Sequence, residues 1–171
     1  MSRAFVKEGD ENLAADELPE RPLGGHSNYV TARGLELLRA RLKELERARD
    51  RLAAADEPMA KQNLLEAKRD IRYCRAQIDR AIVVDPAGQP RDEVHFGATV
   101  TILDEDNKRH AFHIVGDDEA DVASHRISWA SPLAAAMMGA NVGDTVKWQR
   151  PAGVAEVEIV AIRYDGGGGP D

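Results

Sequence analysis

Two stretches of this chain carry apolar residues at alternating spacings of three and four, and this repeat constrains the fold more than any other feature. The first stretch contains Leu35, Leu38, Leu42, Leu45 and Leu52, and only the position of Arg49 interrupts the repeat. The second contains Leu64, Ala67, Ile71, Cys74, Ile78 and Ala81. Charged residues fill most of the positions between them. Each stretch therefore predicts a helix with one narrow apolar seam, which is the pattern of a coiled coil.

A single break separates the two predicted helices. The first is predicted to begin after Thr31, whose hydroxyl can cap it, and to run to about Ala55. The sequence Asp56-Glu57-Pro58 then favours a new helix start, because proline is tolerated in a first turn and poorly tolerated in a helix interior. Asp56 would cap this second helix, with its negative charge at the positive end of the dipole.

The second helix is predicted to end before Asp85-Pro86, since a residue that precedes proline is pushed out of the helical region. Two helices of similar length joined by so short a turn must fold back on each other. The pattern therefore predicts an antiparallel coiled-coil hairpin over residues 29–85, with its tip near residues 55–59.

The remainder of the chain has the period of strands. Strands are predicted at residues 99–103, 109–116, 126–129, 145–149 and 154–164. One short helix is predicted at 131–138, where Ser131 provides the cap, Pro132 the first turn and Gly139 the end. The fold class predicted is α+β, an N-terminal helical hairpin followed by a β-rich domain over residues 91–165.

Composition and charge narrow the functional classes. The net charge of −7 argues against a general nucleic-acid-binding protein, which needs a dominant basic surface. The charge is uneven: residues 30–83 carry 13 Lys and Arg against 9 Asp and Glu, whereas residues 84–171 carry 7 against 15. Such an asymmetry predicts two modules that prefer different partner surfaces. Residues 1–28 contain scattered acids, two prolines and a Gly-Gly pair without any period, and predict a flexible acidic leader.

Sequence signals for catalysis, cofactors and membranes are missing. There is one cysteine, no P-loop, no Gly-x-Gly-x-x-Gly motif and no arrangement typical of nucleophilic catalysis. No apolar run approaches the roughly 18 residues of a membrane span, and the N-terminus lacks the features of a signal peptide. We therefore expect a cytoplasmic protein that is not an enzyme and has no cofactor of its own.

Three stretches resemble the GreA/GreB family of bacterial transcription factors. They are Tyr29 to Leu35, Val94 to Val100, and Ile127 to Ala134 followed by Gly139 to Val146. The third is the most specific, because a strand, a capped helix and a Gly-Asp turn recur in order. The resemblance implies an FKBP-like C-terminal domain and a hairpin that enters the secondary channel of RNA polymerase to regulate elongation. It also implies indirect contact with the DNA and RNA of the elongation complex, and we expect a monomer.

The predicted tip departs from the family. Cleavage-competent members carry an Asp, a Glu three residues later and then an Asn, which help the polymerase to hold a second Mg²⁺. Here Asp56 and Glu57 are adjacent and Pro58 follows. Two interpretations stay open: the acids are ordinary capping residues, or they form a relocated acidic tip that shares Mg²⁺ with the polymerase. The resemblance thus implies polymerase binding without implying stimulation of transcript cleavage.

Further contact candidates come from the two modules. Arg49, Arg51 and Lys61 belong to a basic hairpin face that could follow an acidic channel rim, or could be a solvated helix exterior. Ser131, Pro132 and Leu133 correspond to the region that meets the channel rim in the family, and equally could do no more than start a helix.

Two rival functions are compatible with the pattern. An FKBP-like fold suggests a peptidyl-prolyl isomerase, which needs an aromatic-lined pocket that Phe96, Phe112, Trp129, Trp148 and Tyr164 would have to supply. A coiled-coil adaptor that does not bind polymerase is the other alternative.

Overall fold

The computed structural model describes residues 18–165, which form two compact units. One unit contains the chain up to Gly25 together with Arg39–Asp79, and the other contains His26–Leu38 together with the chain from Arg80 onward. Most of the leader predicted over residues 1–28 lies outside the described residues.

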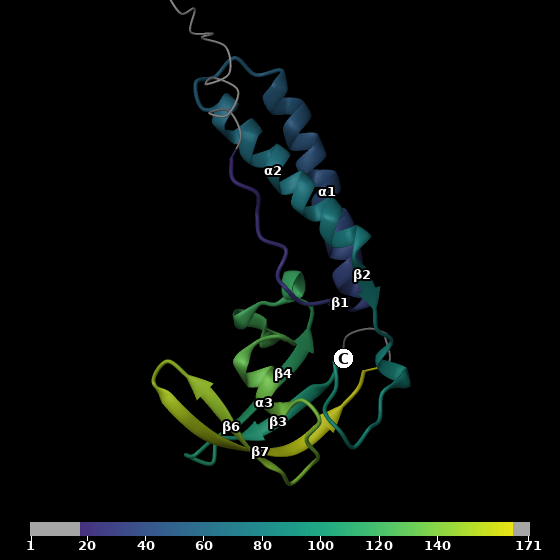
Figure 1. Cartoon of the computed structure of the whole chain (residues 1–171), viewed down its shortest axis with the longest axis vertical. Helices are drawn as coiled ribbons and strands as arrows, with labels where there is room; N and C mark the ends of the chain where they lie inside the picture. Colours follow the sequence, from purple (N-terminus) through teal and green to yellow (C-terminus); the bar gives the residue numbers. More distant parts are fainter. Residues whose placement is uncertain (1–17, 166–171) are drawn as a thin grey trace, which may run out of the picture. The chain divides into compact units, whose positions relative to one another are not determined.

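Two antiparallel helices, α1 (Ala32–Ala53) and α2 (Ala60–Asp79), form the predicted hairpin (Figure 1). Leu45, Ile71 and Cys74 are buried together between them, with Leu42 and Tyr73 packed alongside. Arg75 donates to Glu46 at 2.7 Å and links the charged flanks of the two helices. The seam predicted from the spacing is confirmed, and Cys74 is one of its small buried members, as expected for a thiol at such a position.

The described end of the N-terminal segment runs along α2. The guanidinium of Arg21 lies 3.8 Å from the centroid of the Tyr73 ring and 3.6 Å from the carboxylate of Asp70. Arg72 of α2 donates to Glu20 at 2.7 Å. These contacts are half-exposed, so each contributes little by itself, but together they favour one path for residues 20 and 21.

A short parallel pair, β1 (Asn28–Val30) and β2 (Ala81–Val83), joins the chain before α1 to the chain after α2. Asn28 pairs with Ala81 and Val30 with Val83. The prediction that Ala81 continues the seam of the second helix is wrong. The helix ends at Asp79, because Ile82 and Val83 are β-branched residues that the strand at 28–30 can pair.

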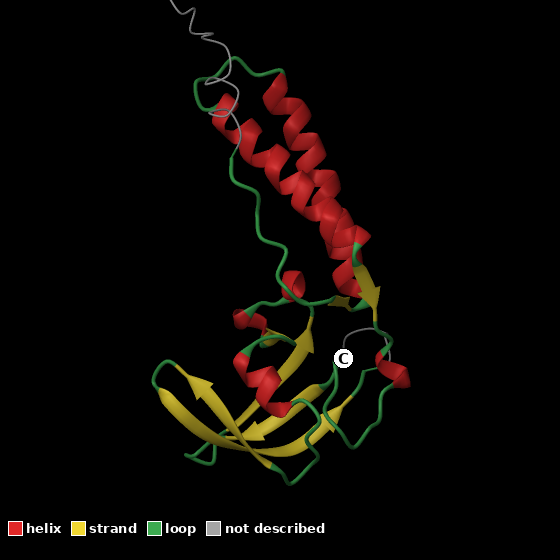
Figure 2. Ribbon diagram, viewed as in Figure 1, coloured by secondary structure: helices red, strands yellow, loops and turns green. Residues whose placement is uncertain are grey.

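Five strands form the sheet of the second unit (Figure 2). They are β3 (Thr99–Leu103), β4 (Arg109–Val115), β5 (Arg126–Ser128), β6 (Thr145–Arg150) and β7 (Gly153–Arg163). Their order is β5-β4-β3-β7-β6, and only the β4–β5 pair is parallel. Every strand predicted from alternation is present, with ends that differ by one residue at most.

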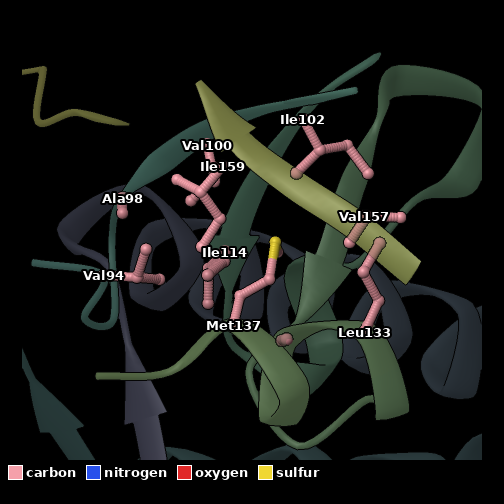
Figure 3. Packing of buried hydrophobic residues seen from close by; sticks show 10 residues of the cluster. Val94, Ala98, Val100, Ile102, Ile114, Leu133, Met137, Val157 and Ile159 are labelled. Atoms are coloured by element: carbon pink, nitrogen blue, oxygen red, sulfur yellow. The ribbon is translucent and has the colours of Figure 1, made fainter. Parts of the chain in front are cut away.

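Helix α3 (Pro132–Met137) packs its apolar side on one face of this sheet. Met137 and Leu133 point towards sheet residues that include Ile114 and Val157 (Figure 3). Gly139 follows the helix with φ of +79°, a left-handed conformation that glycine adopts without steric cost. The short helix predicted at 131–138 is confirmed, and with it the α+β class.

Candidate functional site

The hairpin tip is a loop of residues 54–59 between α1 and α2. Asp56 and Glu57 are both exposed in it, and Met59 is 63% exposed. Within the described part of the chain, the two carboxylates make no hydrogen bond and no ion pair. They are therefore open to a partner from outside.

The capping role predicted for Asp56 is wrong. The backbone carbonyl of Glu57 accepts from Ala60 N at 3.0 Å, which forms a turn at Pro58-Met59 before the helix begins. The first bond of the helical pattern runs from Asn63 N to the Met59 carbonyl, at 3.1 Å. Asp56 thus lies too far ahead of α2 to cap it, and Pro58 precedes the first turn instead of occupying it.

Basic residues flank this acidic loop. Arg49 in α1 pairs with the carboxylate of its neighbour Asp50 at 2.9 Å. Arg51 is exposed in the last turn of α1, where the helix dipole favours a cation. Lys61 is exposed in the first turn of α2, where the dipole opposes one. The tip thus presents two acids between basic flanks, all within one unit.

Ser131, Pro132 and Leu133 open α3 in the other unit. The Ser131 hydroxyl accepts from Ala134 N at 3.4 Å and so caps the helix, as predicted. Pro132 is exposed, whereas Leu133 is only 4% exposed and belongs to the sheet core. The side chain of Leu133 is therefore committed to folding, and Pro132 is the residue of the three that faces solvent.

The start of α1 is tied to a buried acid that the sequence pattern did not indicate. Thr31 caps the helix by accepting from Gly34 N at 2.9 Å. Its hydroxyl donates to Glu119 at 2.5 Å, and Glu119 is only 5% exposed. A Cβ atom on Gly34 would stand 2.8 Å from the Glu119 carboxylate, so a larger residue there would require that carboxylate to move. Residue 119 lies far along the chain, so no local signal could have identified this contact.

Aromatic packing holds β1 in the same unit. The Tyr29 and Trp129 rings meet edge to face with centroids 5.0 Å apart, and His26 packs on Trp129 at the same distance. His26 also lies 3.2 Å from the carboxylate of Asp117, which accepts from the hydroxyl of Ser128. Aromatic packing and polar contacts thereby fix strand β1 and the residues just before it to the loops around the sheet.

The pKa values of His113 and Asp104 are displaced for identifiable reasons. Burial lowers the pKa of His113 below its usual 6.5, although the nearby Glu119 carboxylate opposes the shift. The pKa of Asp104 is lowered mainly by the backbone N–H of Lys108, with a further contribution from the hydrogen bond to His110. Asp104 thus stays ionised and its turn stays acidic.

The aromatic residues required by the isomerase alternative do not share one pocket. Phe112 and Trp148 line a cavity of about 390 Å³ at the end of the sheet. Phe96 and Trp129 line a different cavity of about 330 Å³, with Tyr29. Tyr164 donates its hydroxyl hydrogen to the backbone carbonyl of Glu93.

Among residues 18–165, no three His, Cys, Asp or Glu side chains are grouped as a metal ion would require. No helix in that range is both long and apolar enough to cross a membrane.

Comparison with known proteins assigns the family. The model described as "Transcription elongation factor, GreA/GreB, C-term" matches residues 89–164. Transcription elongation factor GreB of Neisseria meningitidis serogroup B is 36% identical over 153 residues, covering 80% of this chain and 94% of the relative. Transcription elongation factor GreA of Alkalilimnicola ehrlichii is 38% identical over 154 residues, covering 79% and 96%.

The solved structure of Thermus aquaticus Gfh1 is 27% identical, with a TM-score of 0.40 over 80% of this chain and 98% of that one. The matches cover nearly the whole length of these two relatives. They confirm the resemblance carried by the three motifs. The chain belongs to the GreA/GreB family of transcription elongation factors and is a regulator, not an enzyme in its own right.

Proposed function

We propose that this protein binds RNA polymerase through both units and regulates elongation. The hairpin enters the secondary channel of the polymerase, and the C-terminal domain docks at the channel rim. The observation that carries this proposal is the form of the hairpin: two helices thick, closed by one seam, and ending in two carboxylates without partners among the described residues. Each helix of about 20 residues extends roughly 30 Å at 1.5 Å per residue, which suits a narrow channel.

The role proposed for the tip rests on the finding that its two acids do not cap α2. Neither Asp56 nor Glu57 caps α2, which removes the capping part of the interpretation that competed with a functional one. Carboxylate oxygens are the ligands that Mg²⁺ prefers, and an exposed loop can present them to a metal held by the polymerase. The two acids are adjacent instead of three residues apart, so we propose modulation of the polymerase as the main activity and do not assign strong stimulation of cleavage.

The basic flanks and the start of α3 complete the contact surface. Arg51 and Lys61 are exposed beside the tip, and Arg49 is half-buried beside them, where an acidic channel wall would attract all three. Pro132 and part of Ser131 are accessible at the start of α3, while Leu133 supports them from the core. Docking therefore uses Pro132 directly and Leu133 only through the position of the helix.

A binding experiment tests the docking surface. Core polymerase is immobilised, and the full chain is compared with Pro132→Glu, which places a charge on the surface where the helix dipole tolerates an acid. We expect the variant to bind at least about tenfold more weakly. Val142→Glu is the matched control, since Val142 is 53% exposed in the same domain outside α3. Equal binding by both variants would refute docking at Pro132, and failure of the unchanged chain to bind would refute the proposed function.

A transcript-cleavage assay on stalled elongation complexes tests the tip. The double variant Asp56→Ala with Glu57→Ala is compared with Asp79→Ala, an exposed acid at the other end of α2. Any cleavage seen with the unchanged chain should be lost in the double variant and kept in the control. Cleavage that survives in the double variant would exclude these acids as metal ligands.

The two rival functions have direct tests. A proline-isomerisation assay on a model peptide should show no acceleration, because the aromatic residues are divided between two cavities. Light scattering should give the mass of a monomer, since the apolar seam of the hairpin is filled by its own two helices.

A further inference from the structure

One end of the five-stranded sheet is not covered by α3, on the face that carries this helix. The strand registers place Ile102 opposite His110, and Trp148 opposite Ala155. Helix α3 has six residues and extends about 9 Å, whereas the eleven residues of β7 extend about 35 Å. A helix this short covers only part of the face, and no residue of α3 lines the cavity beyond it.

The resulting cavity, which we call the sheet-end groove, has a volume of about 390 Å³. Ile102, Ala155 and Val157 form its buried floor, and Ile102 and Val157 are labelled among the buried side chains of Figure 3. The half-buried rings of Phe112 and Trp148 also line it. Its size suits one or two side chains, so the groove fits a linear segment better than a folded surface.

An acidic turn borders the groove. Asp104, Glu105 and Asp106 line it, against the single cation Arg150, whose guanidinium lies 5.2 Å from the Trp148 ring centroid. Asp104 is occupied by its own turn, because it accepts from the backbone N–H groups of Asp106 and Lys108 and contacts His110. Glu105 accepts from Glu156 N at 3.2 Å and is exposed, as is Asp106.

The surroundings have the same sign. Residues 84–165 carry 7 Lys and Arg against 14 Asp and Glu. A cation near Glu105 and Asp106 would therefore be attracted both by its immediate neighbours and by the field of the whole domain.

We propose that the sheet-end groove binds an extended protein segment in which an apolar side chain is flanked by Lys or Arg. The apolar side chain enters between Phe112 and Trp148, and the flanking cations pair with Glu105 and Asp106. The groove is a binding site separate from the hairpin tip, and it is a recognition site for a basic linear motif. Peptide binding can be measured on the chain alone, without polymerase. Its failure can therefore be distinguished from a failure of the proposed polymerase function.

The test is a titration of the isotope-labelled full chain with three synthetic peptides, followed by nuclear magnetic resonance. The probe is Gly-Ser-Lys-Leu-Lys-Ser-Gly, and the comparisons replace both lysines by glutamate or the leucine by serine. The chain has two tryptophans, so the indole N–H signal of Trp148 in the groove can be read beside that of Trp129, which lines a different cavity. We expect the lysine–leucine peptide to move the Trp148 signal and leave that of Trp129 in place.

Charge is tested by variants that keep the fold. Glu105→Gln retains the acceptor used by Glu156 N, and together with Asp106→Asn it should weaken the probe peptide about threefold to tenfold, as expected for two exposed ion pairs. The glutamate peptide should be weaker by a similar factor. Glu158→Gln is the matched control: Glu158 is exposed on β7, and its side chain alternates to the opposite face from Val157.

Each result either supports or refutes the sheet-end groove as a peptide-binding site. Movement of Trp148 with the expected charge dependence supports the site. Equal binding of the lysine and glutamate peptides, a response at Trp129 alone, or no response at Trp148 up to millimolar peptide would overturn it.

Discussion

Gly34→Ala is the substitution whose effect can be worked out most directly from the geometry. The added methyl group would lie 2.8 Å from the Glu119 carboxylate and 3.3 Å from the Thr31 hydroxyl. Both distances are shorter than ordinary contacts, and Glu119 has no solvent to move into because it is 5% exposed. The Thr31–Glu119 hydrogen bond must therefore break or lengthen.

Two opposing contributions determine the size of the effect. Loss of a hydrogen bond to a buried charged group costs about 1.5–3 kcal/mol. Alanine in place of glycine inside a helix contributes about 1 kcal/mol of stability in the opposite direction. The net expectation is a decrease of about 0.5–2 kcal/mol in the free energy of unfolding, although propensity alone predicts an increase.

Urea unfolding followed by tryptophan fluorescence measures this decrease. Both tryptophans belong to the unit that contains Gly34 and Glu119, so their fluorescence reports on the relevant structure. The midpoint should fall by a few tenths of a molar to about 1 M. Glu119→Ala is the matched background, because removing the carboxylate frees the space that the methyl group needs.

In that background Gly34→Ala should stabilise the protein by up to about 1 kcal/mol, so that the two substitutions are coupled by about 1.5–3 kcal/mol. If the effects of the two substitutions simply added, or if Gly34→Ala stabilised the otherwise unchanged chain, the steric account of this contact would be refuted.

Three further substitutions test other parts of the fold. Leu45→Ala removes a side chain buried in the hairpin seam and should cost about 2–3 kcal/mol, seen as a lower urea midpoint of the helical circular-dichroism signal. Leu133→Ala should cost about 2–4 kcal/mol by tryptophan fluorescence; an effect below about 0.5 kcal/mol would mean that Leu133 is a surface residue after all. Burial lowers the pKa of His113, so the folded state binds fewer protons than the unfolded state, and stability present above the unfolded pKa of about 6.5 is lost as the pH falls towards the lower folded value. His113→Gln should therefore flatten the fall in urea midpoint between about pH 7 and about pH 5.5, and an unchanged slope would contradict this assignment.

Several features were predictable because short-range chemistry determines them. The leucine spacing indicated both helices, and Thr31 and Ser131 were identified as caps because a hydroxyl before an apolar repeat can accept a free N–H of the first turn. Strand alternation located all five strands of the sheet. The tip acids were located in sequence as well, since they stand at the only break between the two repeats.

The start of α2 could not be predicted from neighbouring residues alone. Asp56 and Pro58 are good helix-starting residues, yet the chain makes a turn at Pro58-Met59 and begins the helix at Ala60. Ala60 is 4% exposed, so burial of this small side chain accompanies the later start. The helix thus starts later than a capping preference worth about 1 kcal/mol would favour.

The sequence by itself determined both helical repeats, the five strands of the sheet and the caps at Thr31 and Ser131, because each depends on residues only a few places apart. Tertiary structure alone decided which distant residues come together: Asn28 pairs with Ala81, Thr31 bonds to Glu119, and Phe112 and Trp148 line the same groove. Such contacts depend on the burial and pairing of residues far apart in the chain, and no periodicity within one segment encodes them.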